Sequence, residues 1–342
     1  MRGNSAAALV AVASSALLVH CRPTLPDVAP VPASVGSRPV APDPVAPPGP
    51  RSPTPADVAA RGGRVDVRFL DVGQGDATLV RTSDGHALLV DSGPPEAAAV
   101  VERAVHDVGD TLDALVLSHA HADHMGRVDA LASRIRLGSL FEPGFAEKPT
   151  AVYGKVLRAA KERGIPVRSP RRGERFDLGA YVSFAVLGPS EPLLARTRSD
   201  VNANSIVLRM DHRAEGGDVR VLFEADAEAE TEKRLLEAPD SLRADVLKVA
   251  HHGSKYASSR KMLGAVHPKF AVISCGLAND YGHPNGETLT RLHEANVTFF
   301  RTDLDGTIDL VSEGHGPVVT PSRPADPATH DAAGVRPSRH EE

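Results

Sequence analysis

The 342-residue sequence has no tryptophan, and aromatic side chains make up only 4% of it. A hydrophobic core must therefore be built from alanine, valine, leucine and isoleucine, within a hydrophobic fraction of 41%. There are only two cysteines, Cys21 and Cys275, which argues against a disulfide framework. The formal net charge of −5 argues against capture of nucleic acid by bulk charge, although it permits a local basic groove.

The first 21 residues have the pattern of an export signal. Arg2 supplies a positive charge, and the apolar run from Ala6 to Val19 is too short for a comfortable membrane span. Cys21 follows directly, as in bacterial lipoprotein signals, although His20 departs from the small residue usual at that place. We expect residues 1–21 to be a signal peptide. The protein would then be exported, either to the bacterial cell envelope as a lipoprotein or to the periplasm or the exterior.

Proline-rich segments flank a regular central region. Residues 22–60 are dominated by Pro, Ala and Val, which predicts an extended, disordered linker. Residues 316–342 have a similar composition and are predicted to be a disordered tail. Residues 61–315 are therefore the predicted folded domain. Its β-rich runs come in groups with helical patterns between the groups, which favours two packed sheets with helices outside. The predicted helices cover 95–109, 151–164, 227–238 and 286–296.

Three histidines and an aspartate fall within six residues of the segment LSHAHADHMG (117–126). They follow an apolar run that predicts a strand, so their side chains leave the strand end close together. Imidazole nitrogens and a carboxylate that converge in this way are what a dinuclear metal site needs. The candidate ligands are His119, His121, Asp123 and His124.

Two further strand ends offer ligands. Asp226 ends the run VLFEAD and could bridge two metals, although it could instead cap the following helix. His251 and His252 end the run DVLKVAHH. Because neighbouring residues on a strand face opposite ways, we expect only one of this pair to bind metal. A polar turn is the alternative for the pair.

Six motifs carry a family resemblance: FLDVGQGDATLV, LLVDSGP, LVLSHAHADHMG, ADVLKVAHHGS, YGHPN and RTDLDGTI, in this order. Together they resemble the metallo-β-lactamase superfamily, and more narrowly the soluble C-terminal domain of the ComEC/Rec2 DNA-internalisation competence proteins. The resemblance covers residues 64–312. It implies an α/β (α+β) fold, the four-layer αββα metallo-β-lactamase sandwich, with the metals at one edge of the two sheets.

The resemblance also implies roles for the ligands of two divalent ions, zinc or manganese. His119 and His121 would hold the first ion, Asp123 and His124 the second, and Asp226 would bridge them. His251 or His252 would complete the ligands of the second ion. The residues expected to support the site are Asp71, Gly73, Gly75, Asp91 and Asn204.

Two positions depart from the family pattern. Ala225 stands where the family has glycine, and if the turn needs a positive φ, alanine costs about 1 kcal/mol there. The histidine that many members contribute from mid-chain has no clear counterpart. The histidine between His124 and Asp226 in the sequence is His212, which is predicted to be a solvated hairpin residue. The first ion would therefore take Asn204 or water as its further ligand.

The expected reaction is attack by a metal-activated hydroxide. Asp123 or Asp226 would position it, and His283 of YGHPN together with Lys248 or Lys255 would donate to the developing oxyanion or leaving group. His283 has a structural alternative as a turn residue before Pro284. Cys275 is in an apolar run and is expected in the core rather than at the metals.

A basic stretch favours a polyanionic substrate, although a solvated helix face explains it equally well. Tyr153 and Phe176 are the aromatic candidates near it for base stacking. The basic residues are Lys155, Arg158, Lys161, Arg163, Arg168, Arg171, Arg172 and Arg175.

Three functional hypotheses follow. The first is a phosphodiesterase or nuclease acting on single-stranded DNA. The second is an envelope hydrolase of a small ester, such as a choline-phosphate ester, a lactone or a thioester. The third is a non-catalytic binding lipoprotein, which the intact ligand motifs disfavour. Membrane contact is expected only through the N-terminal lipid anchor.

Overall fold

The computed structural model describes residues 63–145, 151–215 and 217–323. All described residues belong to a single compact unit. The predicted signal peptide, Cys21, the linker and the end of the predicted tail lie outside the described residues. Within the described ranges, no helix is both long enough and apolar enough to cross a membrane.

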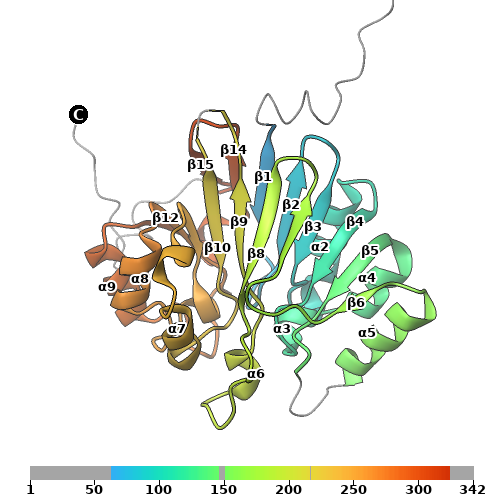
Figure 1. The fold of residues 1–342 in the computed structure, drawn as a ribbon, viewed down its shortest axis with the longest axis horizontal. Helices are drawn as coiled ribbons and strands as arrows, with labels where there is room; N and C mark the ends of the chain where they lie inside the picture. Colours follow the sequence, from blue (N-terminus) through green and yellow to red (C-terminus); the bar gives the residue numbers. More distant parts are fainter. Residues whose placement is uncertain (1–62, 146–150, 216, 324–342) are drawn as a thin grey trace, which may run out of the picture. The chain divides into compact units, whose positions relative to one another are not determined.

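Two mixed β-sheets form the centre of the domain (Figure 1). The first has eight strands in the order β15-β14-β1-β2-β3-β4-β5-β6, and the second has seven in the order β13-β12-β11-β10-β9-β8-β7. The first sheet contains β1 Val65–Phe69, β2 Thr78–Thr82, β3 Ala87–Val90, β4 Thr111–Val116, β5 Arg136–Phe141, β6 Val167–Arg168, β14 Ile308–Ser312 and β15 Pro317–Pro321. The second contains β7 Arg175–Leu178, β8 Val182–Gly188, β9 Val207–His212, β10 Val219–Phe223, β11 Val246–Lys248, β12 Phe270–Ile273 and β13 Thr298–Arg301.

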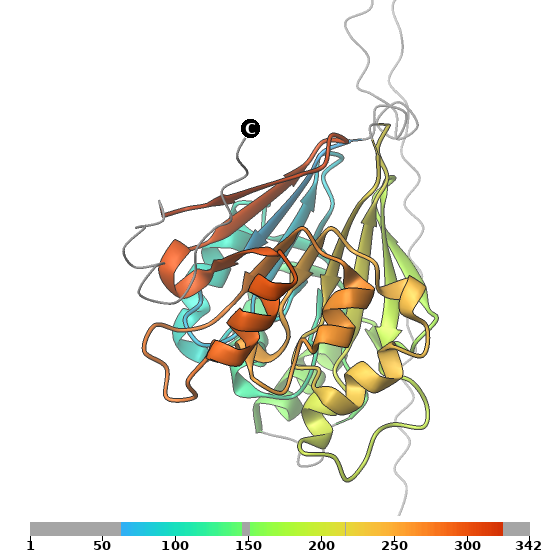
Figure 2. The same ribbon diagram turned by 90° about the vertical axis from the view of Figure 1, so that its left-hand side faces the viewer.

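Helices cover the outer faces of both sheets. In Figure 1 the helices from the first half of the chain lie on the side of the first sheet, and Figure 2 shows the later helices in front of the second. The earlier group is η1 Pro95–Ala97, α2 Ala98–His106, α3 Ala122–Met125, α4 Val128–Arg134 and α5 Ala151–Glu162. The later group is α6 Asp200–Ala203, α7 Ala229–Leu235, η2 Pro239–Leu242, η3 Ala250–Gly253, α8 Arg260–Val266, α9 Gly286–Glu294 and α10 Thr302–Asp305.

Three hydrophobic clusters hold these layers together. The central cluster packs residues of both sheets against each other, for example Phe69 of β1 with Phe223 of β10, whose ring centroids are 6.3 Å apart. A second cluster joins the first sheet to α2, α4 and α5, and a third joins the other sheet to α7, α8 and α9. Helix, sheet, sheet and helix therefore form four layers, and the predicted αββα sandwich is confirmed.

Strand direction explains why the candidate ligands meet. Strands β3, β4 and β5 run parallel in the first sheet, and β10, β11 and β12 run parallel in the second. The carboxyl ends of parallel strands share an edge, where α/β proteins generally place their sites. The segments that follow β3, β4, β10 and β11 carry the predicted ligands, so both sheets deliver them to one place.

The folded domain extends further than the sequence analysis predicted. The segment that begins the predicted tail contains β15, which pairs antiparallel with β14, from Pro317 opposite Ser312 to Pro321 opposite Ile308. Its two prolines stand at the strand ends and β15 is an edge strand, where a missing amide donor is tolerated. The Val-Val-Thr sequence between them has high β propensity, which the proline-rich composition obscured.

Candidate metal centre

The segment after β4 places four candidate ligands at one turn. His119 and His124 are fully buried, and α3 begins at Ala122, directly after His121. Asp91, which follows β3, lies behind this turn. Its carboxylate accepts hydrogen bonds from the Ser118 amide and hydroxyl, each at 2.7 Å, and lies 2.8 Å from Nδ1 of His124. With Nδ1 engaged, His124 presents Nε2 to the interior of the site.

The second sheet supplies Asp226 and His252. Asp226 follows β10, is 2% exposed, and lies near His119 and His124. One of its oxygens is 3.5 Å from Nε2 of His119, and the other is 3.3 Å from Nε2 of His124. His252 follows β11 of the same sheet, and its Nε2 lies 3.2 Å from the Asp123 carboxylate and 3.8 Å from Asp226. Its Nδ1 is fixed at 2.9 Å from the Ser274 carbonyl oxygen.

The side chains form two donor sets around one carboxylate. His119, His121 and Asp226 offer ligand atoms within 4.8 Å of one another, and so do Asp123, His124 and His252. Asp226 is 2% exposed and faces imidazoles of both sets. This geometry can hold two cations, with Asp226 between them.

Unpartnered buried atoms support that fit. Within the ranges that the structure describes, His124 Nε2 and Asp226 Oδ1 are buried and face each other at 3.3 Å, but neither has a hydrogen bond of good geometry. Buried polar atoms are nearly always satisfied, by protein, by water or by an ion. Nitrogen and carboxylate donors without a thiolate suit several divalent metals. The residues present therefore fit divalent metal ions.

Electrostatics favour positive charge on His124 and His252 and a neutral His119. Burial lowers the pKa of His119 well below its usual range. Burial also opposes charge on His124, yet the carboxylates of Asp226, Asp91 and Asp123 together raise its pKa well above the usual value. The pKa of His252 rises to about 10, because the attraction of nearby carboxylates, led by Asp226, exceeds the effect of burial. Bound cations would take the place of these protons.

Asp76 is a candidate site residue that the sequence analysis did not identify. Its buried carboxylate accepts a hydrogen bond from Lys248 Nζ at 2.8 Å and lies 3.4 Å from His252 Nδ1. It belongs to a further candidate group with Asp226 and His252. The available signal was an aspartate placed between a double-glycine turn and an apolar run, in VGQGDATLV.

The expectation that Lys248 donates to a substrate is corrected by its position. Lys248 is the last residue of β11 and only 2% exposed, and its ammonium group donates to Asp76 and, at 3.2 Å, to the Val249 carbonyl oxygen. A buried ammonium group held in this way has no path to a bound substrate. Asp76 in turn lies 3.4 Å from His252 Nδ1, so Lys248 is linked to the donor set through Asp76. The alternative, Lys255, is exposed.

Glycine is required at one point of the VGQGD turn. Gly75 has φ 149°, and a Cβ there would lie 2.4 Å from the Asp123 carbonyl oxygen. The next amide, of Asp76, donates to that same oxygen at 3.2 Å. Gly73 has φ 74° with open space around it, and its amide approaches the Asp71 carboxylate at 3.4 Å. Asp71 also pairs with Arg323, so it braces the start of the turn.

Asn204 does not face the donor sets. Its amide oxygen accepts from Leu194 N, and its amide nitrogen donates to the carbonyl oxygens of Leu194 and Asp200, each at 2.8 Å. Both the oxygen and the nitrogen of this buried amide are hydrogen-bonded within the 194–204 loop, so Asn204 is not a candidate ligand. His212 is also not a solvated turn residue: it is buried in β9, 2.7 Å from the Ser312 hydroxyl. Strand β9 continues as far as His212, which pairs with Val182 of β8 and Val219 of β10. The polar composition of the segment after Met210 had instead predicted a turn.

The structure distinguishes the two adjacent histidines, although not by strand alternation. Strand β11 ends at Lys248, and His251 and His252 follow with φ 46° and 52°, in the left-handed region. His252 joins a donor set, whereas His251 Nδ1 lies 2.8 Å from Glu228 and its Nε2 is 3.6 Å from Asp226. Glu228, two residues beyond Asp226, is a further residue the sequence analysis did not identify.

His283 lies beside this histidine pair. Its ring centroid is 5.4 Å from that of His251 and 6.1 Å from that of His252. Burial and the neighbouring imidazoles of His252 and His251 lower its pKa to about 4, so it is neutral at neutral pH. Cys275 lies in the core as expected, and burial raises the pKa of its thiol.

The basic stretch divides into two parts. Three of its arginines form hydrogen bonds or ion pairs with other parts of the domain. Arg163 donates to the Ile135 carbonyl oxygen, Arg171 pairs with Glu191 at 2.6 Å, and Arg172 donates to the Arg234 carbonyl oxygen. Lys155, Arg158 and Lys161 instead lie on the exposed face of α5, three residues apart. The two aromatic candidates are unsuited to stacking, since Tyr153 is buried against Glu142 and Phe176 packs on Phe141 and Phe184.

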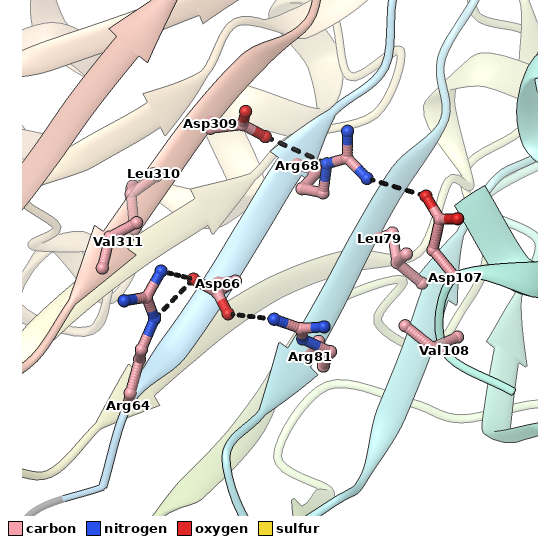
Figure 3. Close-up of a pocket in the computed structure, with 10 residues that line it drawn as sticks. All are labelled: Arg64, Asp66, Arg68, Leu79, Arg81, Asp107, Val108, Asp309, Leu310 and Val311. Atoms are coloured by element: carbon pink, nitrogen blue, oxygen red, sulfur yellow. Dashed lines mark hydrogen bonds and ion pairs between the residues drawn. The ribbon is translucent and has the colours of Figure 1, made fainter.

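A separate pocket of about 250 Å³ lies on the outer face of the first sheet (Figure 3). Asp66 and Arg68 alternate with inward-facing residues of β1. Asp66 pairs with Arg81 at 3.0 Å, and Arg68 pairs with Asp309 at 3.0 Å. Figure 3 shows these ion pairs crossing neighbouring strands. None of the donor-set residues lines this pocket, and its charges largely neutralise one another.

Comparison with known proteins agrees with the geometry. Residues 70–192 match the model of the metallo-beta-lactamase superfamily. The chain is 35% identical over 198 residues to ComE operon protein 3 of Bacillus subtilis (strain 168), covering 58% of this chain and 24% of that protein. It is 33% identical over 249 residues to competence protein ComA of Neisseria gonorrhoeae, covering 71% of this chain and 32% of that protein. The chain thus spans about a third or less of the length of these relatives.

Among solved structures, a mutant of the CmlA beta-hydroxylase aligns with a TM-score of 0.47 and 18% identity, covering 72% of this chain and 53% of that one. A diphosphatase from the PhnP family aligns with a TM-score of 0.42 and 15% identity, covering 72% of this chain and 98% of that one. The sequence matches and the four-layer architecture show that this chain contains a domain of the metallo-β-lactamase fold, and its curated homologues include competence proteins of the ComEC family.

Proposed function

We propose that the domain is a metal-dependent phosphodiesterase that cleaves single-stranded DNA. The observation that carries this proposal is the pair of donor sets that face the single carboxylate of Asp226. His119 and His121 would hold one divalent ion, and Asp123, His124 and His252 the other. Zinc and manganese both suit these donors.

Two such ions, when bound, supply a hydroxide at neutral pH and a Lewis acid for a phosphoryl oxygen. The protein's own groups provide the orientation. Asp123 is the more exposed of the two carboxylates in the donor sets, at 34%, and is therefore better placed to orient a water. Neutral His283, beside His251, can donate a hydrogen bond to a phosphoryl or leaving-group oxygen.

The choice of DNA is supported by two observations. The relatives named above are competence proteins, although the chain spans only part of their length. The exposed row of Lys155, Arg158 and Lys161 on α5 offers three positive charges to a phosphate backbone. Helix α5 packs against the first sheet through the same hydrophobic cluster as Met125 of α3, the helix that carries Asp123.

The test compares the wild-type protein with Asp226→Asn, after metal removal and refilling with zinc or manganese. We expect the variant to lose cleavage of a single-stranded oligonucleotide by about 100-fold or more, because it loses a charged ligand. The control is Asp245→Asn, which lies before β11, at the opposite end of the strand from His252, and should cleave normally.

The outcomes separate the alternatives. Full activity of Asp226→Asn would exclude the dinuclear assignment. Cleavage of p-nitrophenyl phosphorylcholine but not DNA would identify an esterase for small substrates. Absence of any hydrolysis by the metal-loaded wild type, together with retained metal binding, would identify a binding protein.

We also propose that residues 1–21 direct export and that Cys21 carries a lipid anchor. The apolar run and the position of Cys21 support this. The Cys21→Ser variant should move from the membrane fraction to the soluble fraction of the expressing cell, as detected by immunoblot. Cys275→Ser, which changes the other cysteine, should remain with the membrane. Unchanged membrane retention of Cys21→Ser would contradict the proposal.

A further inference from the structure

Exposed tyrosines are found in the segments that carry the metal-site histidines. The sequence has four tyrosines and no tryptophan. Tyr153 and Tyr181 are buried, whereas Tyr256 and Tyr281 are 44% and 72% exposed. Among the described residues, all phenylalanines and the other two tyrosines are buried or half-buried, so Tyr256 and Tyr281 are the exposed ones. Exposed aromatic rings beside a candidate active site are available to stack with planar groups of a ligand.

Tyr256 forms a stack with Arg198. The guanidinium carbon lies 3.5 Å from the ring centroid, and Lys255 Nζ lies 5.0 Å from it. The pair is linked to the metal centre, because Arg198 lies 3.9 Å from the Glu228 carboxylate, which also holds His251. Both members remain accessible, since the Arg198 side chain is 53% exposed. The planar guanidinium thus extends the aromatic surface outward.

Tyr281 lies on the other histidine-bearing loop. Its ring stacks on His283 with a centroid distance of 5.9 Å and an interplanar angle of 23°. The turn is fixed by Asn279, whose side-chain oxygen accepts from the amides of Tyr281 at 3.2 Å and His283 at 3.0 Å. This tyrosine is therefore held in place while its ring stays in solvent, next to an imidazole that contacts His251 and His252.

We propose that Tyr281 and the Arg198–Tyr256 pair form a stacking subsite for the unpaired bases of a single-stranded polynucleotide. The inference rests on the proposed phosphodiesterase function and specifies its substrate class. Every base presents a π face, so tyrosine and guanidinium planes bind bases without reading their sequence. Lys255 and Arg198 supply positive charge for the adjoining phosphates. Bases paired within a duplex are not available to such a surface, so the subsite selects single strands.

The test separates base contacts from phosphate contacts. Binding is measured by fluorescence anisotropy on the full-length, metal-loaded Asp226→Asn protein, which should not cut the strand. One probe is an oligothymidylate of about 10 nucleotides, and the other is an abasic strand of the same length and charge. We expect the oligothymidylate to bind about 100-fold more tightly than the abasic strand, because two stacked bases would each contribute about tenfold.

Substitutions then assign the contacts. Tyr281→Ala and Tyr256→Ala should each weaken binding of the oligothymidylate about tenfold and leave the abasic strand unchanged. Tyr281→Phe and Tyr256→Phe are the matched controls and should bind as the parent does, because the ring remains. Arg198→Lys keeps the charge but loses the planar group, so it should reduce binding of the oligothymidylate alone.

Two results would overturn the inference in distinguishable ways. Equal binding of the two strands, with no effect of the alanine variants, would show that bases are not contacted. Hydrolysis of the abasic strand by the wild-type protein would then still support the phosphodiesterase. If the wild-type protein neither binds nor cleaves either strand, the proposed function itself fails, and the subsite with it.

Discussion

At the scale of single residues, the metal-site turns hold several non-glycine residues in left-handed conformations. Ala225 has φ 49°, and the adjacent segment has His251 at 46° and His252 at 52°. The two turns are joined by a hydrogen bond of 2.9 Å from His251 N to the Ala225 carbonyl oxygen. The positive φ that the sequence analysis considered at Ala225 is therefore present. Left-handed backbone costs a residue with a Cβ about 1–2 kcal/mol.

The Ala225→Gly variant should accordingly be more stable than the wild type by about 1 kcal/mol, since glycine adopts this conformation without a steric penalty. Urea unfolding of the metal-free proteins measures the difference. Ala227→Gly, a buried position outside the set with positive φ, is the control and should be destabilised. A lower free energy of unfolding for Ala225→Gly would contradict the strain at this position.

At the scale of elements, a buried ion pair connects the VGQGD turn of the first sheet to β11 of the second. Asp76 and Lys248 are 2.8 Å apart, and their side chains are 7% and 3% exposed. Attraction by Lys248, with His252 and His124, lowers the pKa of Asp76 against the effect of burial. Removing one partner would leave the other as a buried, unpaired charge.

Lys248→Met should therefore lower the free energy of unfolding by about 3–5 kcal/mol. The double variant Asp76→Asn/Lys248→Met should be less destabilised than Lys248→Met alone, because no unpaired charge remains. Urea unfolding of the wild type, both single variants and the double variant gives the coupling energy. Additive effects of the two substitutions would show that the pair does not act as a unit.

At the scale of the whole domain, the metal centre connects the two sheets. His119, His121, Asp123 and His124 follow a strand of the first sheet, while Asp226 and His252 follow strands of the second. Ions held by both groups would oppose separation of the sheets. A ligand that binds only the folded state stabilises it by mass action.

Zinc or manganese at about 100 times its dissociation constant should therefore raise the free energy of unfolding by about 2.7 kcal/mol. Differential scanning calorimetry of the metal-free and metal-loaded proteins measures this as an increase in Tm that a chelator reverses. The Asp226→Asn variant should show a smaller increase. An unchanged Tm with both metals would contradict binding at these residues.

Local sequence patterns were enough to predict the fold class and the types of ligand at the candidate site. Apolar runs that end in His, Asp and Gly specify strands with metal-binding groups at their ends, and these signals are local in the chain. His119, His121, Asp123, His124 and Asp226 therefore carry their chemical character before any folding is considered. The family resemblance in six motifs supplied the four-layer arrangement.

Contacts between distant segments set which of these groups meet at the site and which are hydrogen-bonded elsewhere. Lys248 is bound to Asp76 from 172 residues away, and Asn204 is committed to its own loop. His251 and His252 diverge because their backbone is left-handed rather than extended. The exposed stacking residues lie far apart in sequence, at 198, 256 and 281. Each of these outcomes depends on contacts between distant segments and on local φ values, which residue type and periodicity do not encode.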